Sequence, residues 1–223
     1  SSTPAQTLPI TPARRTPQAE FQIAQAKASI VPFIKPNPND TFSSFEKAVG
    51  AGIALTVDGL IITPNALKNI SGFKGAPEDG LPFSLAVALG KNGKPIILAG
   101  TGLTLLKPAS GEQLPQLKPV TLSGFEDLAI GQSVFAVNAT QQISWHHIAA
   151  LYPHASPAQP LSSEDPQGGF FMVDTPPEAG AFLFNAEGQL IGIAIEAGEV
   201  IPAEWIAAAV RQYLRDGTYH PVT

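Results

Sequence analysis

The chain has 223 residues, of which 44% are hydrophobic and 14% are charged, and it carries a formal net charge of -5 with no cysteine. This length and composition predict a globular protein with one large core or two smaller ones. The acidic balance, with Arg14–Arg15 as the only basic pair, argues against nucleic-acid binding. The lack of cysteine excludes disulfides and thiolate metal sites.

Residues 1–20 are rich in proline, threonine, alanine and glutamine, and we expect a flexible tether because such a segment buries too little surface to offset the entropy of ordering it. No apolar run reaches the roughly 18 residues of a membrane span. The first residues show no charged-then-apolar signal pattern, so a signal peptide could already have been removed. A short helix at Phe21–Lys27 should lead into a strand at Ser29–Ile34.

Between residues 36 and 126, short β-rich runs alternate with turn residues, which is typical of an antiparallel barrel rather than of β-α-β units. Asp58–Gly59 and Asn92–Gly93 are strong hairpin signals. The proline-rich stretch 108–119 is expected to cross from a first barrel to a second. The expected strands are Gly52–Val57, Leu60–Thr63, Leu85–Leu89 and Pro95–Ala99.

The second half repeats this pattern, with a hairpin expected at Asn185–Gly188. After Pro202, apolar residues from Trp205 to Leu214 recur at helical spacing until Gly217, which predicts a helix that packs on the second barrel. The expected strands are Gln132–Val137, Gln142–Ala149, Phe170–Val173, Ala181–Asn185 and Leu190–Glu196.

Several short segments resemble, in order, motifs of the HtrA/Deg family of trypsin-like serine proteases. Residues 58–67 resemble Asp-Gly-x-Ile-Leu-Thr-x-x-His-Val, and residues 102–107 resemble Asp-Leu-Ala-Leu-Leu-Lys. Residues 174–193 resemble Gly-Asn-Ser-Gly-Gly-Pro-Leu followed by Asn-x-x-Gly-x-x-Ile-Gly-Ile, and residues 128–137 resemble the strand that opens the second barrel. The resemblance spans roughly residues 25–220.

The resemblance implies an all-β fold of two six-stranded β-barrels of chymotrypsin/trypsin type with a C-terminal α-helix. After the tether, the expected order is a first barrel, an inter-barrel crossing, a second barrel, the C-terminal helix and an exit segment. Their bounds are 21–110, 111–119, 120–202, 203–216 and 217–223.

The resemblance places Ala66, Gly102 and Ala179 at the histidine, aspartate and serine positions of the catalytic triad. It also implies a degenerate oxyanion loop at Pro177, Glu178 and Gly180, where proline has no N–H to donate. No histidine precedes residue 146, although the base belongs to the first barrel in this fold. We therefore expect no enzyme but a pseudoprotease with a binding, scaffolding or regulatory role and a protein or peptide partner.

The resemblance to the family also implies partners and a cellular location. Phe21 is a candidate contact of a homotrimer, and association with active HtrA-like proteases is an alternative. The expected location is periplasmic or otherwise extracytoplasmic, with membrane anchoring in a longer protein left open. No cofactor and no nucleic acid are expected.

Two other classes stay open. A hydrolase with a relocated active site would need Ser144 or Thr175 within hydrogen-bond reach of His146 or His147. A metal-binding module would use His147 with His154, or His146 with a carboxylate such as Glu164 or Asp165. Neighbouring strand residues face opposite ways, so we expect one of His146 and His147 inward and the other outward. The carboxylates Asp174, Glu178 and Glu187 are expected to be solvated loop residues.

Overall fold

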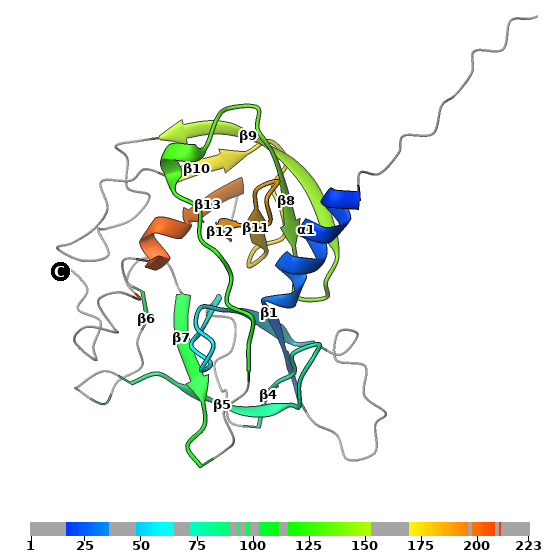
Figure 1. The fold of residues 1–223 in the computed structure, drawn as a ribbon. Helices are drawn as coiled ribbons and strands as arrows, with labels where there is room; N and C mark the ends of the chain where they lie inside the picture. Colours follow the sequence, from blue (N-terminus) through cyan, green and yellow to red (C-terminus); the bar gives the residue numbers. More distant parts are fainter. Residues whose placement is uncertain are drawn as a thin grey trace, which may run out of the picture.

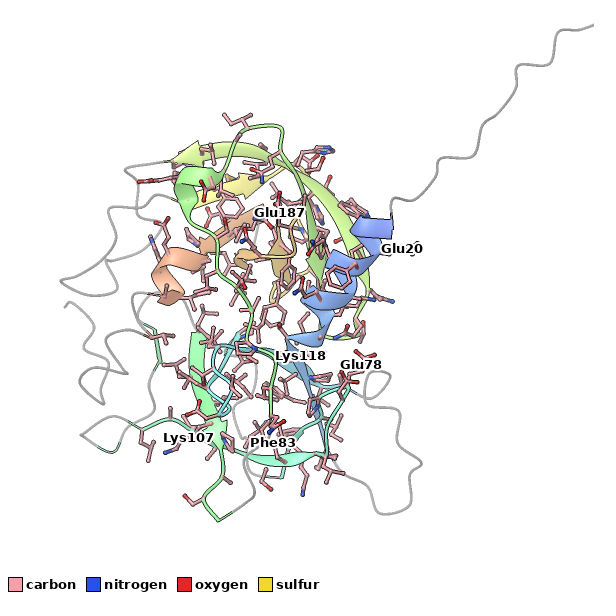
Figure 2. All side chains as sticks on the ribbon, viewed as in Figure 1. Glu20, Glu78, Phe83, Lys107, Lys118 and Glu187 are labelled. Atoms are coloured by element: carbon pink, nitrogen blue, oxygen red, sulfur yellow. The ribbon has the colours of Figure 1, made fainter. Side chains whose placement is uncertain are left out.

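The computed structural model describes residues 17–35, 48–64, 72–89, 93, 97–98, 103–111, 116–152, 170–195, 198–207 and 210. Figure 1 shows two groups of strands, one above the other, with helix α1 (Pro17–Ala28) lying beside the upper group. In Figure 2, Phe83 and Lys107 mark the lower group and Glu187 marks the upper one. These groups are the two barrels.

Among the described residues, the first sheet has seven strands in the order β3-β2-β1-β4-β5-β7-β6, and six of them form the first barrel. Pairing of β3 with β7 closes the ring, and the two-residue strand β6 pairs with Leu103 and Thr104 of β7. The strands are β1 (Ile30–Ile34), β2 (Gly50–Ala54), β3 (Ile61–Pro64), β4 (Lys74–Gly75), β5 (Phe83–Val87), β6 (Ile97–Leu98) and β7 (Leu103–Pro108).

The second barrel is a closed ring in the order β10-β13-β12-β11-β8-β9. Its strands are β8 (Ser133–Val137), β9 (Ile143–Tyr152), β10 (Phe170–Val173), β11 (Phe182–Phe184), β12 (Leu190–Ala194) and β13 (Glu199–Pro202). The expected all-β double barrel is thus confirmed. The strands β4, β7 and β13 were not among the expected ones.

Neighbouring residues of the strands serve two different cores, because alternate side chains point to opposite faces. In β8 and β11, Val134 and Leu183 lie inside the second barrel, whereas Phe135 and Phe184 belong to a cluster that contains residues of both barrels. A third cluster, around Phe33, fills the first barrel. Since both faces of these strands are covered, they read as nearly continuous apolar runs.

Helix α1 begins at Pro17, so residues 17–20, which the sequence placed in the tether, are helical instead. Proline suits a first helical turn because the missing N–H would have no partner there. Residues 203–207 form the start of the C-terminal helix, with Trp205 and Ile206 buried in the cluster that joins the barrels. No helix within the described ranges is long and apolar enough to cross a membrane.

Candidate functional site

A pocket of about 200 Å³ is lined by both barrels. The first barrel contributes the residues around the start of β2 and the end of β3, and the second contributes the turn after β8 and the segment that precedes β11. The lining residues are Val49, Gly50, Ala51, Thr63, Pro64, Asn138, Ala139, Glu178, Ala179, Gly180 and Ala181. Because most of these side chains are small, the pocket stays open between two packed barrels.

Ala179, the expected serine position, lies exposed in this pocket. The next residue, Gly180, has a φ of +91°, and a Cβ there would lie 3.3 Å from Cγ of Pro64. Glycine therefore allows the loop to approach the end of β3, two residues before position 66 in the chain. Ala66 and Gly102 themselves lie outside the described residues.

The backbone of the expected oxyanion loop is held by hydrogen bonds inside the fold. The Gly180 N–H donates to the Ala194 carbonyl at 2.8 Å, and the Ala181 N–H donates to the Glu178 carbonyl at 3.0 Å. Pro177 is buried and has no N–H. The loop is thus a fixed wall of the pocket, and its role as a degenerate oxyanion loop stays a prediction.

Glu178 reaches the turn after β8, where its Oε2 accepts a hydrogen bond of 3.0 Å from Nδ2 of Asn138. Oδ1 of Asn138 accepts from the N–H groups of Thr140 at 3.1 Å and Gln142 at 2.9 Å. These bonds fix the orientation of the Asn138 amide, as in other Asx turns. Glu178 is therefore exposed but held at the pocket, whereas the sequence indicated only a solvated carboxylate.

His146 and Ser144 form a pair on β9. Both lie on the same face of β9, opposite Val134 and Ala136 of β8, and His146 is buried whereas Ser144 is exposed. Ser144 Oγ lies 2.7 Å from Nε2 of His146, a histidine that is only 4% exposed. With the proton on Nδ1, Nε2 accepts from the serine hydroxyl, which is the arrangement of a general base beside a nucleophile. Nδ1 is buried without a partner among the described residues.

His147 points the opposite way, and its side chain is 57% exposed. The expectation that the two histidines face opposite sides of the strand is thereby confirmed. Within the described ranges, no three histidine, aspartate or glutamate side chains lie close enough together to hold a metal. His154, Glu164 and Asp165 lie outside the described residues.

Asp174 lies directly after β10, and its carboxylate ties this part of the chain to strand β9. Its Oδ1 accepts from the N–H groups of His147 at 3.0 Å and Thr175 at 2.8 Å, and its Oδ2 lies 3.2 Å from Nδ1 of His147. The backbone bond from His147 and then that from Thr175 lower the pKa of Asp174 from 3.8 to about 2. This carboxylate serves the fold rather than the pocket.

We expect Asp174→Asn to lower the free energy of unfolding at neutral pH. In acid, the free energies of unfolding of the variant and the parent should become similar. A carboxylate whose pKa falls from 3.8 to about 2 on folding stabilises the fold above pH 3.8, and this contribution is lost as the pH falls through about 2. Urea unfolding from pH 7 to pH 2 measures the difference. Asp127→Asn, at an exposed site, corrects for the altered net charge. If the difference in the free energy of unfolding between Asp174→Asn and its parent does not change with pH, the lowered pKa of Asp174 is contradicted.

Five of the described residues that line the pocket carry no sequence signal. Val49, Gly50, Ala51, Asn138 and Ala139 lie outside the segments that resemble family motifs, whereas Thr63 and Pro64 fall within residues 58–67, one of those segments. The Thr63 hydroxyl is buried and donates to the Ala51 carbonyl at 2.8 Å, so it ties β3 to β2. The residues between 174 and 181 were identified, because a motif resemblance covers them.

No family model matches the chain, and no similar sequence was found among curated proteins. The fold is similar to that of solved structures of the HtrA-type protease AlgW. In a structure with a decapeptide, the TM-score is 0.61 at 19% identity, over 90% of this chain and 68% of that one. In a structure of an AlgW variant with a tripeptide, it is 0.60 at 16% identity, over 90% of this chain and 64% of that one. The chain thus spans about two thirds of the AlgW chains.

The expectation that the chain is not an enzyme was wrong, because the two AlgW structures with a similar fold are structures of a protease. That expectation depended on the residue types at positions 66, 102 and 179, whose assignment to the triad stays a prediction. At 16% and 19% sequence identity, the comparison shows a shared fold, which is the arrangement of the two barrels. The chain has the trypsin-like double-barrel fold of HtrA-type proteases.

Proposed function

We propose that the chain binds an extended peptide segment of a protein partner in the pocket beside Ala179. The pocket itself carries this proposal, since its small apolar side chains leave about 200 Å³ open between the barrels. Such a volume accepts part of a peptide rather than a drug-sized molecule, whose pockets hold about 300–1,000 Å³. Val49, which is 51% exposed at the pocket, supplies further apolar contact.

The two AlgW structures support this function, because each contains a peptide. In our proposal Ala66, Gly102 and Ala179 stand at the triad positions, so a bound peptide meets the methyl group of Ala179 instead of a hydroxyl. Pro177 cannot donate a hydrogen bond to a peptide carbonyl. Hydrolysis by this chain would consequently need a nucleophile at another place.

The test is the binding of fluorescently labelled peptides from an unfolded protein, followed by anisotropy. The parent should bind, and Ala179→Trp should not, because the indole fills the pocket. If Ala179→Trp still binds the peptides, the peptide does not bind in this pocket.

A second candidate function is hydrolysis with Ser144 as the nucleophile and His146 as the base. The 2.7 Å contact between Ser144 Oγ and His146 Nε2 favours it, because a serine hydroxyl needs an adjacent base to be reactive near neutral pH. Ser144 is exposed, so a small acyl substrate can reach it. In this function, His146 takes the serine proton and later returns it to the leaving group.

For this second function, we expect Ser144→Ala to reduce the hydrolysis of an activated ester by about 10² or more, because the change removes the nucleophile and with it the base assistance, which alone contributes about 10²–10⁴. Ser133→Ala is the matched control, since Ser133 is exposed on the neighbouring strand and stands opposite His147 rather than His146. Equal turnover in the parent and in Ser144→Ala would reject this candidate.

The proposal also includes self-association of the chain and its cellular location. Phe21 is 63% exposed on α1, which suits a residue that contacts a second copy of the chain or an HtrA-like protease. The similarity to HtrA-type proteases supports an extracytoplasmic location. Sedimentation of the parent and of Phe21→Ala would measure the self-association.

A further inference from the structure

The pocket beside Ala179 has a single charge among its described lining residues. Glu178 is the acidic residue, and every other lining residue is uncharged. Pockets in which one charge stands among apolar groups use that charge to orient a ligand. The charge of Glu178 is therefore the feature of the pocket that can make it selective between peptides.

The carboxylate of Glu178 is held in place without being neutralised. Asn138 presents Nδ2 to it, because Oδ1 of Asn138 is occupied by the N–H of Thr140, the Thr140 hydroxyl and the N–H of Gln142. A carboxylate has about four acceptor sites, and this amide fills one of them. Among the described residues, no lysine, arginine or histidine forms an ion pair with Glu178.

The neighbours of Glu178 in the pocket suit the rest of a basic side chain. Long basic side chains lay their methylene stems along apolar surfaces and keep the charged end at a polar group. Pro64, Ala139 and Ala179 supply such a surface in the pocket that Glu178 also lines. An ammonium or guanidinium donates charge-assisted hydrogen bonds to a carboxylate, whereas an acidic side chain is repelled.

We propose that the pocket selects peptide segments that place a lysine or arginine side chain against Glu178. This inference rests on the proposed peptide binding and adds the class of peptide. The net charge of -5 favours the approach of the same peptides from a distance.

The test compares three blocked alanine peptides that carry lysine, norleucine or glutamate at one central position. Norleucine keeps the apolar stem of lysine and removes the amine. Each peptide is titrated against the parent, Glu178→Gln and Glu187→Gln. Glu187 is an exposed glutamate on the turn between β11 and β12 and does not line the pocket, so its variant matches the change in charge (Figure 2).

We expect the parent to bind the lysine peptide about two- to fivefold more tightly than the norleucine peptide, as an exposed ion pair allows. Glu178→Gln should lose this preference with unchanged affinity for the norleucine peptide, and Glu187→Gln should keep it. Added salt should weaken the preference, because it screens exposed charges.

Equal binding of the lysine and norleucine peptides to the parent would overturn the inference while leaving the proposed peptide binding intact. A preference that survives in Glu178→Gln would also overturn it, since another group would then recognise the lysine. Failure of the parent to bind all three peptides would overturn both this inference and the proposed function.

Discussion

Phe184→Ala is expected to lower the free energy of unfolding by about 3–5 kcal/mol, the usual cost of removing a buried phenylalanine ring. Phe184 is fully buried, and its ring stacks on that of Phe135 with 5.3 Å between the centroids. Both rings belong to the cluster that contains residues of the two barrels. The loss should therefore affect the whole fold rather than one barrel alone.

Urea unfolding of the parent and the variant measures this difference. The matched control is Leu81→Ala, since Leu81 is 85% exposed, and its effect should stay within about 0.5 kcal/mol. If Phe184→Ala does not fold, Phe184→Leu should still fold with a smaller loss. Equal effects of the two alanine variants would contradict the assigned role of Phe184.

Ala179→Trp is expected to reduce peptide binding by at least about tenfold, which corresponds to about 1.4 kcal/mol. Ala179 is exposed at a pocket of about 200 Å³, so an indole occupies the space that a peptide side chain needs. Because the position is exposed, the fold should tolerate the change.

Anisotropy titrations with labelled peptides measure this loss, and unfolding curves check that the variant is folded. Ala149→Trp is the matched control, because Ala149 is exposed on β9 outside the pocket and its variant should bind like the parent. Similar affinities of the two tryptophan variants would place the peptide elsewhere on the surface.

The barrel strands that follow strong turn signals could be predicted from the sequence. Asp58–Gly59 lies between β2 and β3, with Gly59 at a φ of 105°, and Asn185–Gly188 lies between β11 and β12. These hairpins depend on residues close together in the chain. The alternation along β9 likewise predicted that His146 and His147 face opposite sides.

The closing strands could not be predicted in this way. β7 pairs with β3 and β5, and β13 pairs with β10 and β12, so each barrel closes through partners that no local pattern identifies. β4 has two residues, which is too short for a period to be recognised, whereas β6 lies within the expected strand Pro95–Ala99.

The class of fold, the strands beside clear turns and the residue types at positions 66, 102 and 179 could be read from the amino-acid sequence alone. Only the packing of the two barrels shows that Val49, Thr63, Asn138 and Ala179 line one pocket and that Asn138 holds Glu178 there. The comparison with solved structures then contradicted the expectation of a non-enzyme. Turns and periodicity are local properties, whereas the pocket exists because two barrels pack together and bring distant segments side by side.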